Sequence, residues 1–310
     1  MSDGPAGAPL PASALVFHAD DFGLTPGVNA GILAAYRAGP VRSASLMVTT
    51  PGFDEAVTLA RQHPGLDLGL HLNLTAGVPC LPPATIPSLV DRAGRFHPLG
   101  RWLRLAFGRR LEPAEVAAEL TAQAERALAT GLPFSHLDSH HHIHLFAPAL
   151  PVVAGLARRL GLPVVRRSDE RRLLRASPVI GRLLRVPPLG AAWRRQWLLA
   201  LATRRAARAL AGLTHADYFG GLPLLGAGLD AGQLQLLVAH LPPGTIELMC
   251  HPGYGDAALA TLDPGAAARE REVALLTNPA LLASLRAAGV ALIRSADLAR
   301  PRPAAPPTAD

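Results

Sequence analysis

The chain has 310 residues, 49% of them hydrophobic, and a formal net charge of +7. This is enough for one large barrel or two smaller domains with a substantial core. Cys80 and Cys250 lie far apart without a CxxC spacing, so we expect free thiols, a reducing compartment and no Cys-ligated metal site. All 30 basic residues are arginine, which is typical of a GC-rich genome, so the basic charge is weak evidence for nucleic-acid binding.

Residues 1–13 are rich in Gly, Pro and Ala and lack the basic start and long apolar run of a signal peptide. No stretch reaches the roughly 18 uninterrupted apolar residues that a membrane-spanning helix needs. We therefore expect a cytoplasmic protein with a flexible N-terminus at 1–13 and a disordered Pro/Ala-rich tail at 299–310.

Short runs rich in Val, Leu and Ile alternate with longer amphipathic stretches, as expected of repeated βα units. The predicted elements are, in chain order, strand 14–17, helix 28–38, strand 43–48, helix 53–62, strand 68–74, helix 113–130, strand 134–138, helix 148–160, strand 163–166, a further short strand 216–219, helix 231–240, strand 245–250, helix 279–288 and strand 290–294. Seven or eight such units without a GxGxxG motif favour an α/β fold of the TIM-barrel-like (β/α) type over a doubly wound sheet.

Two stretches interrupt this rhythm, residues 77–112 and 168–213. We interpret them as insertions on a single barrel domain that spans 14–298. The second insertion is unusually basic, because twelve arginines lie between Arg166 and Arg208 against only two acids, Asp169 and Glu170.

Polar residues follow four of the predicted strands. They are Asp20-Asp21, His71, the segment 136–144 and His251-Pro252, each at the carboxyl end of its strand. In a (β/α) barrel these ends form one face, which is the usual location of catalysis. Four distant segments are therefore expected to converge on one site.

The segment from His136 to His144 holds five of the twelve histidines, together with Asp138. Imidazole and carboxylate suit zinc and other divalent first-row metals, whereas magnesium prefers mostly oxygen donors. If residues 140–144 are extended, His140, His142 and His144 share a face; if they are helical, only His140 and His144 align. All five cannot bind one ion, and a polar loop with incidental histidines is the alternative.

Four segments are read together: HADDFG at 18–23, GLHL at 69–72, HLDSHHHIH at 136–144 and ELMCHPG at 247–253. In this order and spacing they resemble the YdjC-like (ChbG-type) carbohydrate deacetylases, from about Leu15 to Leu298. The resemblance implies a TIM-barrel-like fold and metal-dependent removal of N-acetyl groups from amino sugars. His18 departs from the family pattern, which usually has Asn there, and this is expected to affect how the first carboxylate is hydrogen-bonded.

Carried onto matching positions, the resemblance implies Asp21, His71 and His140 as ligands of a divalent metal, Mg²⁺ or Zn²⁺. It implies Asp20 as general base and His251 as general acid. A metal with three protein ligands keeps positions for water and substrate, lowers the pKa of that water and polarises the acetamide carbonyl. A carboxylate that is not a ligand can then take the water's proton, and an imidazole can protonate the departing amine near neutral pH.

The aspartate pair and its neighbours also have plainer interpretations. Adjacent residues of a regular strand face opposite sides, so one of Asp20 and Asp21 could be a turn former or a helix cap. Asp138 is expected to orient a ligating histidine rather than bind metal. His251 could simply pack at a strand end.

The histidine segment leaves the third ligand open between His140 and His142. If His140 binds the metal, His142 and His144 are expected to be structural or to support the ligands.

Within the resembling family, some members act on chitooligosaccharides, and a subgroup associated with hopanoid biosynthesis acts on an N-acetylglucosaminyl hopanoid. We therefore expect an N-acetylated sugar or glycolipid as substrate. The segments RLLR at 182–185 and WRRQWLLAL at 193–201 mix arginine with Trp and Leu, as an interfacial helix does at anionic lipid headgroups. Peripheral contact of 168–213 with an anionic inner membrane face is thus one interpretation, and a solvated amphipathic cap is the other.

Other function classes stay open. Carboxylate and His ligands in a barrel also serve phosphoesterases, although the chain has no P-loop. A non-catalytic metal- or anion-binding protein is a further alternative. Binding of nucleic acid is not expected, because aromatic residues make up 5% of the chain and it has no RNP or KH-type signature. The sequence leaves the oligomeric state open, and a homodimer is one alternative.

Overall fold

The computed structural model describes residues 10, 13–177, 179–180, 191–221, 231–263 and 266–301. The predicted flexible N-terminus and the predicted disordered tail lie largely outside these residues, as does the 182–185 segment. Among the described helices, none combines the length and the apolar composition that crossing a membrane requires.

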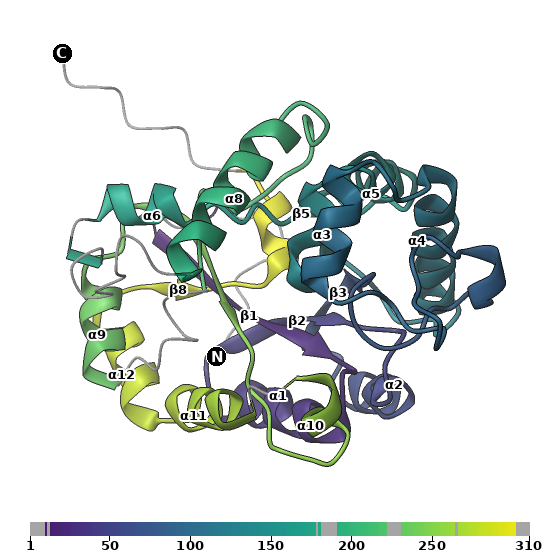
Figure 1. Cartoon of the computed structure of the whole chain (residues 1–310). Coiled ribbons are helices and arrows are strands. Elements are labelled where there is room, and N and C mark those ends of the chain that lie inside the picture. The colour runs from purple at the N-terminus through teal and green to yellow at the C-terminus, as the bar shows by residue number, and fades with distance from the viewer. Residues whose placement is uncertain are drawn as a thin grey trace.

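The centre of the molecule is a parallel sheet with helices packed around it (Figure 1). Its described strands are β1 (Ser13–Phe22), β2 (Val41–Leu46), β3 (Asp67–Leu72), β4 (His136–Ser139), β5 (Val164–Val165), β6 (Tyr218–Gly220), β7 (Gly244–Cys250) and β8 (Ala291–Leu292). The predicted strands are all present, including the short one near 216–219, which is β6.

The strand order is β5-β4-β3-β2-β1-β7-β6, with β8 paired to β1. One edge of β1 pairs with β7 from Ser13 to Ala19, and its other edge is shared between β8, at Ala14 and Leu15, and β2, from Phe17 onward. Strands β1 to β5 are thus neighbours in sequential order, and β7 and β8 close on β1 from the other end of the chain, in a parallel arrangement that is consistent with a (β/α) barrel-like fold.

Six helices correspond to predicted ones. They are α1 (Pro26–Ala38), α2 (Phe53–Gln62), α4 (Pro113–Leu128), α5 (Ala149–Arg159), α9 (Ala231–Ala239) and α12 (Pro279–Ala287). Local signals explain several of their starts. The Thr25 side chain accepts a hydrogen bond from the amide of Val28 at the start of α1, and Asn278 caps α12 in the same way through Ala280.

The other described helices are outside the predicted elements. They are α3 (Leu99–Phe107), α6 (Glu170–Ala176), α8 (Ala191–Ala206), α10 (Leu259–Leu262) and α11 (Ala266–Leu276), with the 3₁₀ segments η1 (Pro83–Thr85), η2 (His140–Leu145) and η3 (Ser295–Ala299). Residues 193–201, interpreted above as an interfacial helix or an amphipathic cap, nevertheless lie within one of them, α8. The first insertion contains α3 and the second contains α6 and α8. Trp102 of α3 is completely buried, so the first insertion packs into the main core rather than lying on the surface.

β1 is buried on both faces apart from its first residue, as expected of a strand in the middle of a parallel sheet. On the neighbouring strands β3 and β4, Gly69 lies opposite His136. A side chain on Gly69 would collide with the His136 ring, so the missing Cβ is what lets this histidine lie inside the sheet.

We expect Gly69→Ala to destabilise the protein by about 1–3 kcal/mol, because the added methyl group must displace the His136 ring. Gly155→Ala is the matched control, since Gly155 lies within α5 with open space around its Cα, and there alanine should add up to about 1 kcal/mol. Urea unfolding of both variants measures the difference, and equal midpoints would contradict the prediction.

Candidate active site

The end of β1 departs from regular strand geometry at the aspartate pair. The β1–β2 register shifts between Ala19 and Phe22, and Asp21 has a φ of 69°. A left-handed residue in a bulged strand breaks the alternation of sides. As a result, both Asp20 and Asp21 line one cavity of about 700 Å³, and neither is only a turn former or a helix cap.

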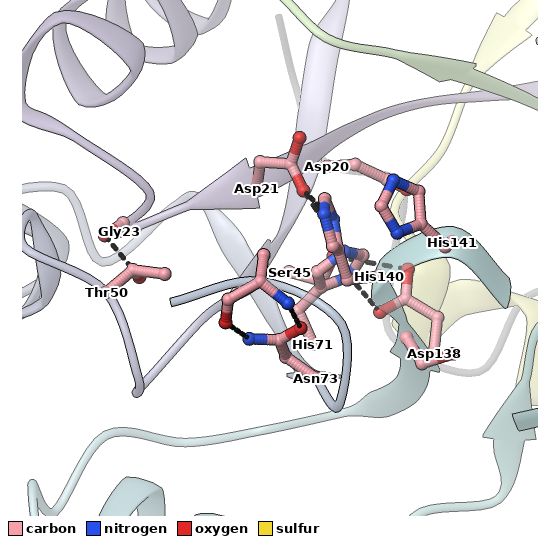
Figure 2. A network of polar contacts seen from close by, with 12 residues as sticks. Asp20, Asp21, Gly23, Ser45, Thr50, His71, Asn73, Asp138, His140 and His141 are labelled. Carbon is pink, nitrogen blue, oxygen red and sulfur yellow. Dashed lines mark hydrogen bonds and ion pairs between the residues drawn. The ribbon is translucent and has the colours of Figure 1, made fainter. Parts of the chain in front are cut away.

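Asp21, His71 and His140 each offer a ligand atom, and these atoms lie within 4.8 Å of one another. Asp21 Oδ1 is 2.9 Å from His140 Nδ1 and 3.3 Å from His71 Nε2 (Figure 2). His71 Nε2 is buried without a hydrogen-bond partner. A buried polar atom without a partner is costly, and a cation between these three side chains would satisfy it, so the residues fit a metal.

Asp138 supports His71 from the other side of the ring (Figure 2). Its Oδ1 accepts from His71 Nδ1 at 2.7 Å, and the Ser45 hydroxyl lies near both groups. Burial alone lowers the pKa of His71, but the Asp138 charge and hydrogen bond raise it to about 10. A proton held on Nδ1 leaves Nε2 as the atom that faces Asp21, which is the arrangement expected for a histidine ligand.

Arg166 lies at the centre of a second buried cluster. Its guanidinium binds Asp20 through two hydrogen bonds of 2.6 and 2.7 Å, and it contacts Asp138 at 2.8 Å and Glu247 at 2.7 Å. Burial raises the pKa of Asp20, but the charge and hydrogen bonds of Arg166, the His18 hydrogen bond and the His71 charge together outweigh it and hold that pKa well below its usual range. His18, Asp20 and Asp138 also have the spacing of a metal site, but the guanidinium already supplies the cation there.

His18 contacts the first carboxylate directly, with its Nδ1 2.9 Å from Asp20 Oδ1. Its Nε2 lies 2.7 Å from His136 Nε2, so these two buried rings share one proton between facing nitrogens. His18 therefore forms part of the immediate surroundings of Asp20.

The segment η2 is neither extended nor a regular helix, because His141 and His142 both have left-handed backbone angles. This geometry directs the four histidines to different partners. His140 reaches Asp21, His141 is exposed and contacts Thr75 at 2.9 Å, and His142 is buried against Ser168 at 3.0 Å. His144 lies between the Ser139 hydroxyl and the Arg166 carbonyl, which is a structural position.

Helix α11 contributes two side chains that sequence reasoning missed. Arg269 donates to Asp21 Oδ2 at 2.6 Å, and Glu272, one turn later, accepts from the His251 amide at 2.5 Å. Both are nine-tenths buried, and both line the cavity with half-buried His251. One helix thus connects the Asp21 carboxylate to the His251 segment.

The model of the family described as YdjC-like protein matches residues 14–287 of this chain. The chain belongs to the YdjC-like protein family.

Two of its relatives are named carbohydrate deacetylases. The one from Geobacillus stearothermophilus is 35% identical, over 90% of this chain and 95% of that protein, and the one from Brevibacillus brevis is 36% identical, over 85% and 90%. A solved structure from Enterococcus faecalis, described as a candidate cellobiose-phosphate cleavage protein, has a TM-score of 0.73 and 27% identity, and the match covers 93% of this chain and 99% of that one.

The sequence assigned no role to Arg166, Glu247, Arg269 or Glu272, although Glu247 begins the ELMCHPG segment at 247–253. A signal exists for Glu247, because a charged residue in the apolar strand at 245–250 is rarely buried without a partner. Arg166 ends the predicted strand 163–166 but is hidden among many other arginines. No local pattern identifies Arg269 or Glu272.

The walls of the cavity come from both insertions. The first provides Phe96 and, on α3, Leu99 and Leu103; the second provides Leu198 and Leu199 on α8. Polar groups from the strand ends and apolar side chains from the insertions therefore line the same cavity, to which Arg95 and Arg195 add positive charge.

Arg166→Met should destabilise the protein by about 3–5 kcal/mol, because it leaves buried carboxylates without their cation. The control is Arg159→Met on the exposed side of α5, which should stay within about 0.5 kcal/mol of the wild type. Thermal and urea unfolding measure both, and a mild effect at Arg166 would show that the cluster contributes little.

Acidification should destabilise the fold through the buried histidines. Burial lowers the pKa of His136 and of His144 from 6.5 to about 4, so the unfolded chain binds more protons between these values. Their stabilisation is complete above pH 6.5 and is lost as the pH falls, by about 2 kcal/mol per histidine between pH 7 and 5. His136→Gln should reduce this loss in urea unfolding, whereas His240→Gln, on the surface, should not.

Proposed function

We propose that this protein is a metal-dependent carbohydrate deacetylase, which removes the N-acetyl group from an N-acetylglucosamine-containing glycan or glycolipid. The observation that carries the proposal is the convergence of Asp21, His71 and His140 beside Asp20 on one cavity wall. Membership of the YdjC-like family, with relatives named carbohydrate deacetylases, supports it.

The ion would be held by Asp21, His71 and His140. Two imidazoles and one carboxylate favour Zn²⁺ or another first-row metal over Mg²⁺, which prefers oxygen donors. When bound, the ion polarises the acetamide carbonyl and lowers the pKa of a water molecule. Arg269 occupies Asp21 Oδ2, so Oδ1 is the oxygen that remains directed at both histidines.

Asp20 is assigned as the general base. The Arg166 ion pair keeps this carboxylate ionised, which is the form that a base requires, and fixes its plane. Because Asp20 is not a member of the proposed ligand group, it keeps this capacity when the metal is bound.

His251 is assigned as the general acid, which protonates the departing amine. It lines the same cavity directly after β7, and Glu272 accepts a hydrogen bond from its backbone amide. Separate residues for base and acid suit amide hydrolysis, in which one proton is removed from water and another is delivered to nitrogen.

The apolar side chains that α3 and α8 contribute to the cavity bear on the substrate. An N-acetyl sugar alone would contact the polar groups from the strand ends, whereas Leu99, Leu103, Leu198 and Leu199 offer apolar surface for which a sugar has little use. This arrangement favours a sugar joined to a lipid, such as an N-acetylglucosaminyl hopanoid, over a free chitooligosaccharide.

The test is acetate release from an N-acetylglucosaminyl lipid and from diacetylchitobiose, with zinc, magnesium or chelator. We expect metal-dependent release from the lipid-linked sugar and a decrease of about 10²–10⁴-fold in Asp20→Asn. Zinc binding should persist in Asp20→Asn but weaken strongly in His71→Ala, as measured by calorimetry. Asp54→Asn, at an exposed position of α2, is the control.

Equal turnover of Asp20→Asn would remove Asp20 as the base. Phosphate release from phosphoesters without acetate release would favour a phosphoesterase, and bound metal without turnover of any substrate would favour a binding protein.

A further inference from the structure

Helix α8 carries a surface stripe outside the catalytic cavity. Arg194, Trp197, Leu201 and Arg204 follow one another at intervals of three and four residues, which places them on one face of the helix. All four are exposed, Trp197 by 46% and Leu201 by 45%. Two large apolar side chains are therefore presented to solvent between arginines.

The surroundings of this stripe are strongly basic. Residues 191–208 contain no acid, and neighbouring α6, which packs against α8, adds Arg171, Arg172 and Arg175. Two acids lie near these arginines in the sequence. Asp169 caps α6 and forms an ion pair with Arg171 at 3.5 Å, and Glu170 is buried, where it accepts from the Gly221 amide. The arginines of this insertion thus far outnumber its acids.

Trp197 forms a cation–π contact with one of these arginines. The Arg171 guanidinium lies 4.1 Å above its ring, and the indole remains nearly half exposed. An aromatic ring paired with arginine at a surface suits the boundary between lipid headgroups and acyl chains, where one side is charged and the other apolar.

The opposite face of α8 lines the cavity through Arg195, Leu198 and Leu199. Helix α8 therefore contributes one set of side chains to the cavity and another to the exposed stripe, so the two lie within roughly 10 Å, the diameter of a helix with its side chains. Figure 1 shows α8 next to α6 at the upper edge of the molecule.

We propose that the α6–α8 surface, defined by Arg171, Arg172, Arg175, Arg194, Trp197, Leu201, Arg204 and Arg205, docks on an anionic lipid bilayer. The arginines bind headgroups, and Trp197 and Leu201 insert among them. Charge alone would also fit RNA, but an apolar pair at the centre of the stripe favours a bilayer. The proposal deepens the proposed function and rests on it, because docking would bring a lipid-linked sugar to the cavity.

The test is flotation of the full-length protein with vesicles of phosphatidylglycerol and phosphatidylcholine, and with pure phosphatidylcholine, at low and high salt. We expect binding to the anionic vesicles only, weakened by salt. Trp197→Ser/Leu201→Ser and, separately, Arg204→Glu/Arg205→Glu should each weaken it by about tenfold or more. Matched controls are Leu236→Ser, a similarly exposed leucine on α9, and Arg37→Glu/Arg92→Glu.

Anisotropy with a fluorescent single-stranded RNA and the same variants separates the alternatives. Vesicle binding that needs both the apolar pair and the arginines supports the proposal. Failure to float with anionic vesicles overturns it, as does binding to RNA and vesicles that depends on the arginines but not on Trp197 and Leu201.

Flotation requires no turnover, so Asp20→Asn should float like the wild type even if acetate release fails. Deacetylation of a water-soluble N-acetyl sugar by the surface variants, together with their thermal unfolding, shows that the variants remain folded.

Discussion

Arg166 is buried among three carboxylates from three strands: Asp20 of β1, Asp138 of β4 and Glu247 of β7. A buried charge is tolerated only when it is paired and hydrogen-bonded, so each member of this cluster requires the others. The same contacts fix the plane of Asp20 and, through Asp138, the ring of His71. The orientation of the proposed base and of one proposed metal ligand thus depends on a single guanidinium.

The second constraint is backbone geometry at the strand ends. Asp21, His141 and His142 have left-handed φ angles, which cost free energy for residues other than glycine and persist only where the surroundings enforce them. At Asp21 the result is that two consecutive carboxylates, Asp20 and Asp21, line one cavity. At η2 the result is that four neighbouring histidines have four different partners, and only His140 joins Asp21 and His71.

The strands and the two insertions contribute different kinds of side chain to the site. The strand ends provide the polar groups on which the chemistry would depend, whereas α3 and α8 provide apolar walls. Because α8 has one face on the cavity and another exposed, it connects the proposed substrate class to the proposed bilayer contact. The reaction and the choice of substrate are in this way assigned to separate parts of the chain.

Local patterns in the sequence were sufficient for the eight strands, for six helices and for the positions of Asp20, Asp21, His71, His140 and His251 at strand ends, because apolar periodicity and short motifs are properties of neighbouring residues. Helices α3, α6, α10 and α11 were missed, although the α11 sequence AAAREREVALL at 266–276 is rich in helix-forming residues, and α8 was anticipated only through the interfacial pattern at 193–201. Only the tertiary structure decided that Arg166 binds three carboxylates, that Arg269 holds Asp21 and that Gly69 makes room for His136. These contacts join residues far apart in the chain, and they depend on strand register and on left-handed backbone turns, neither of which has a local signature.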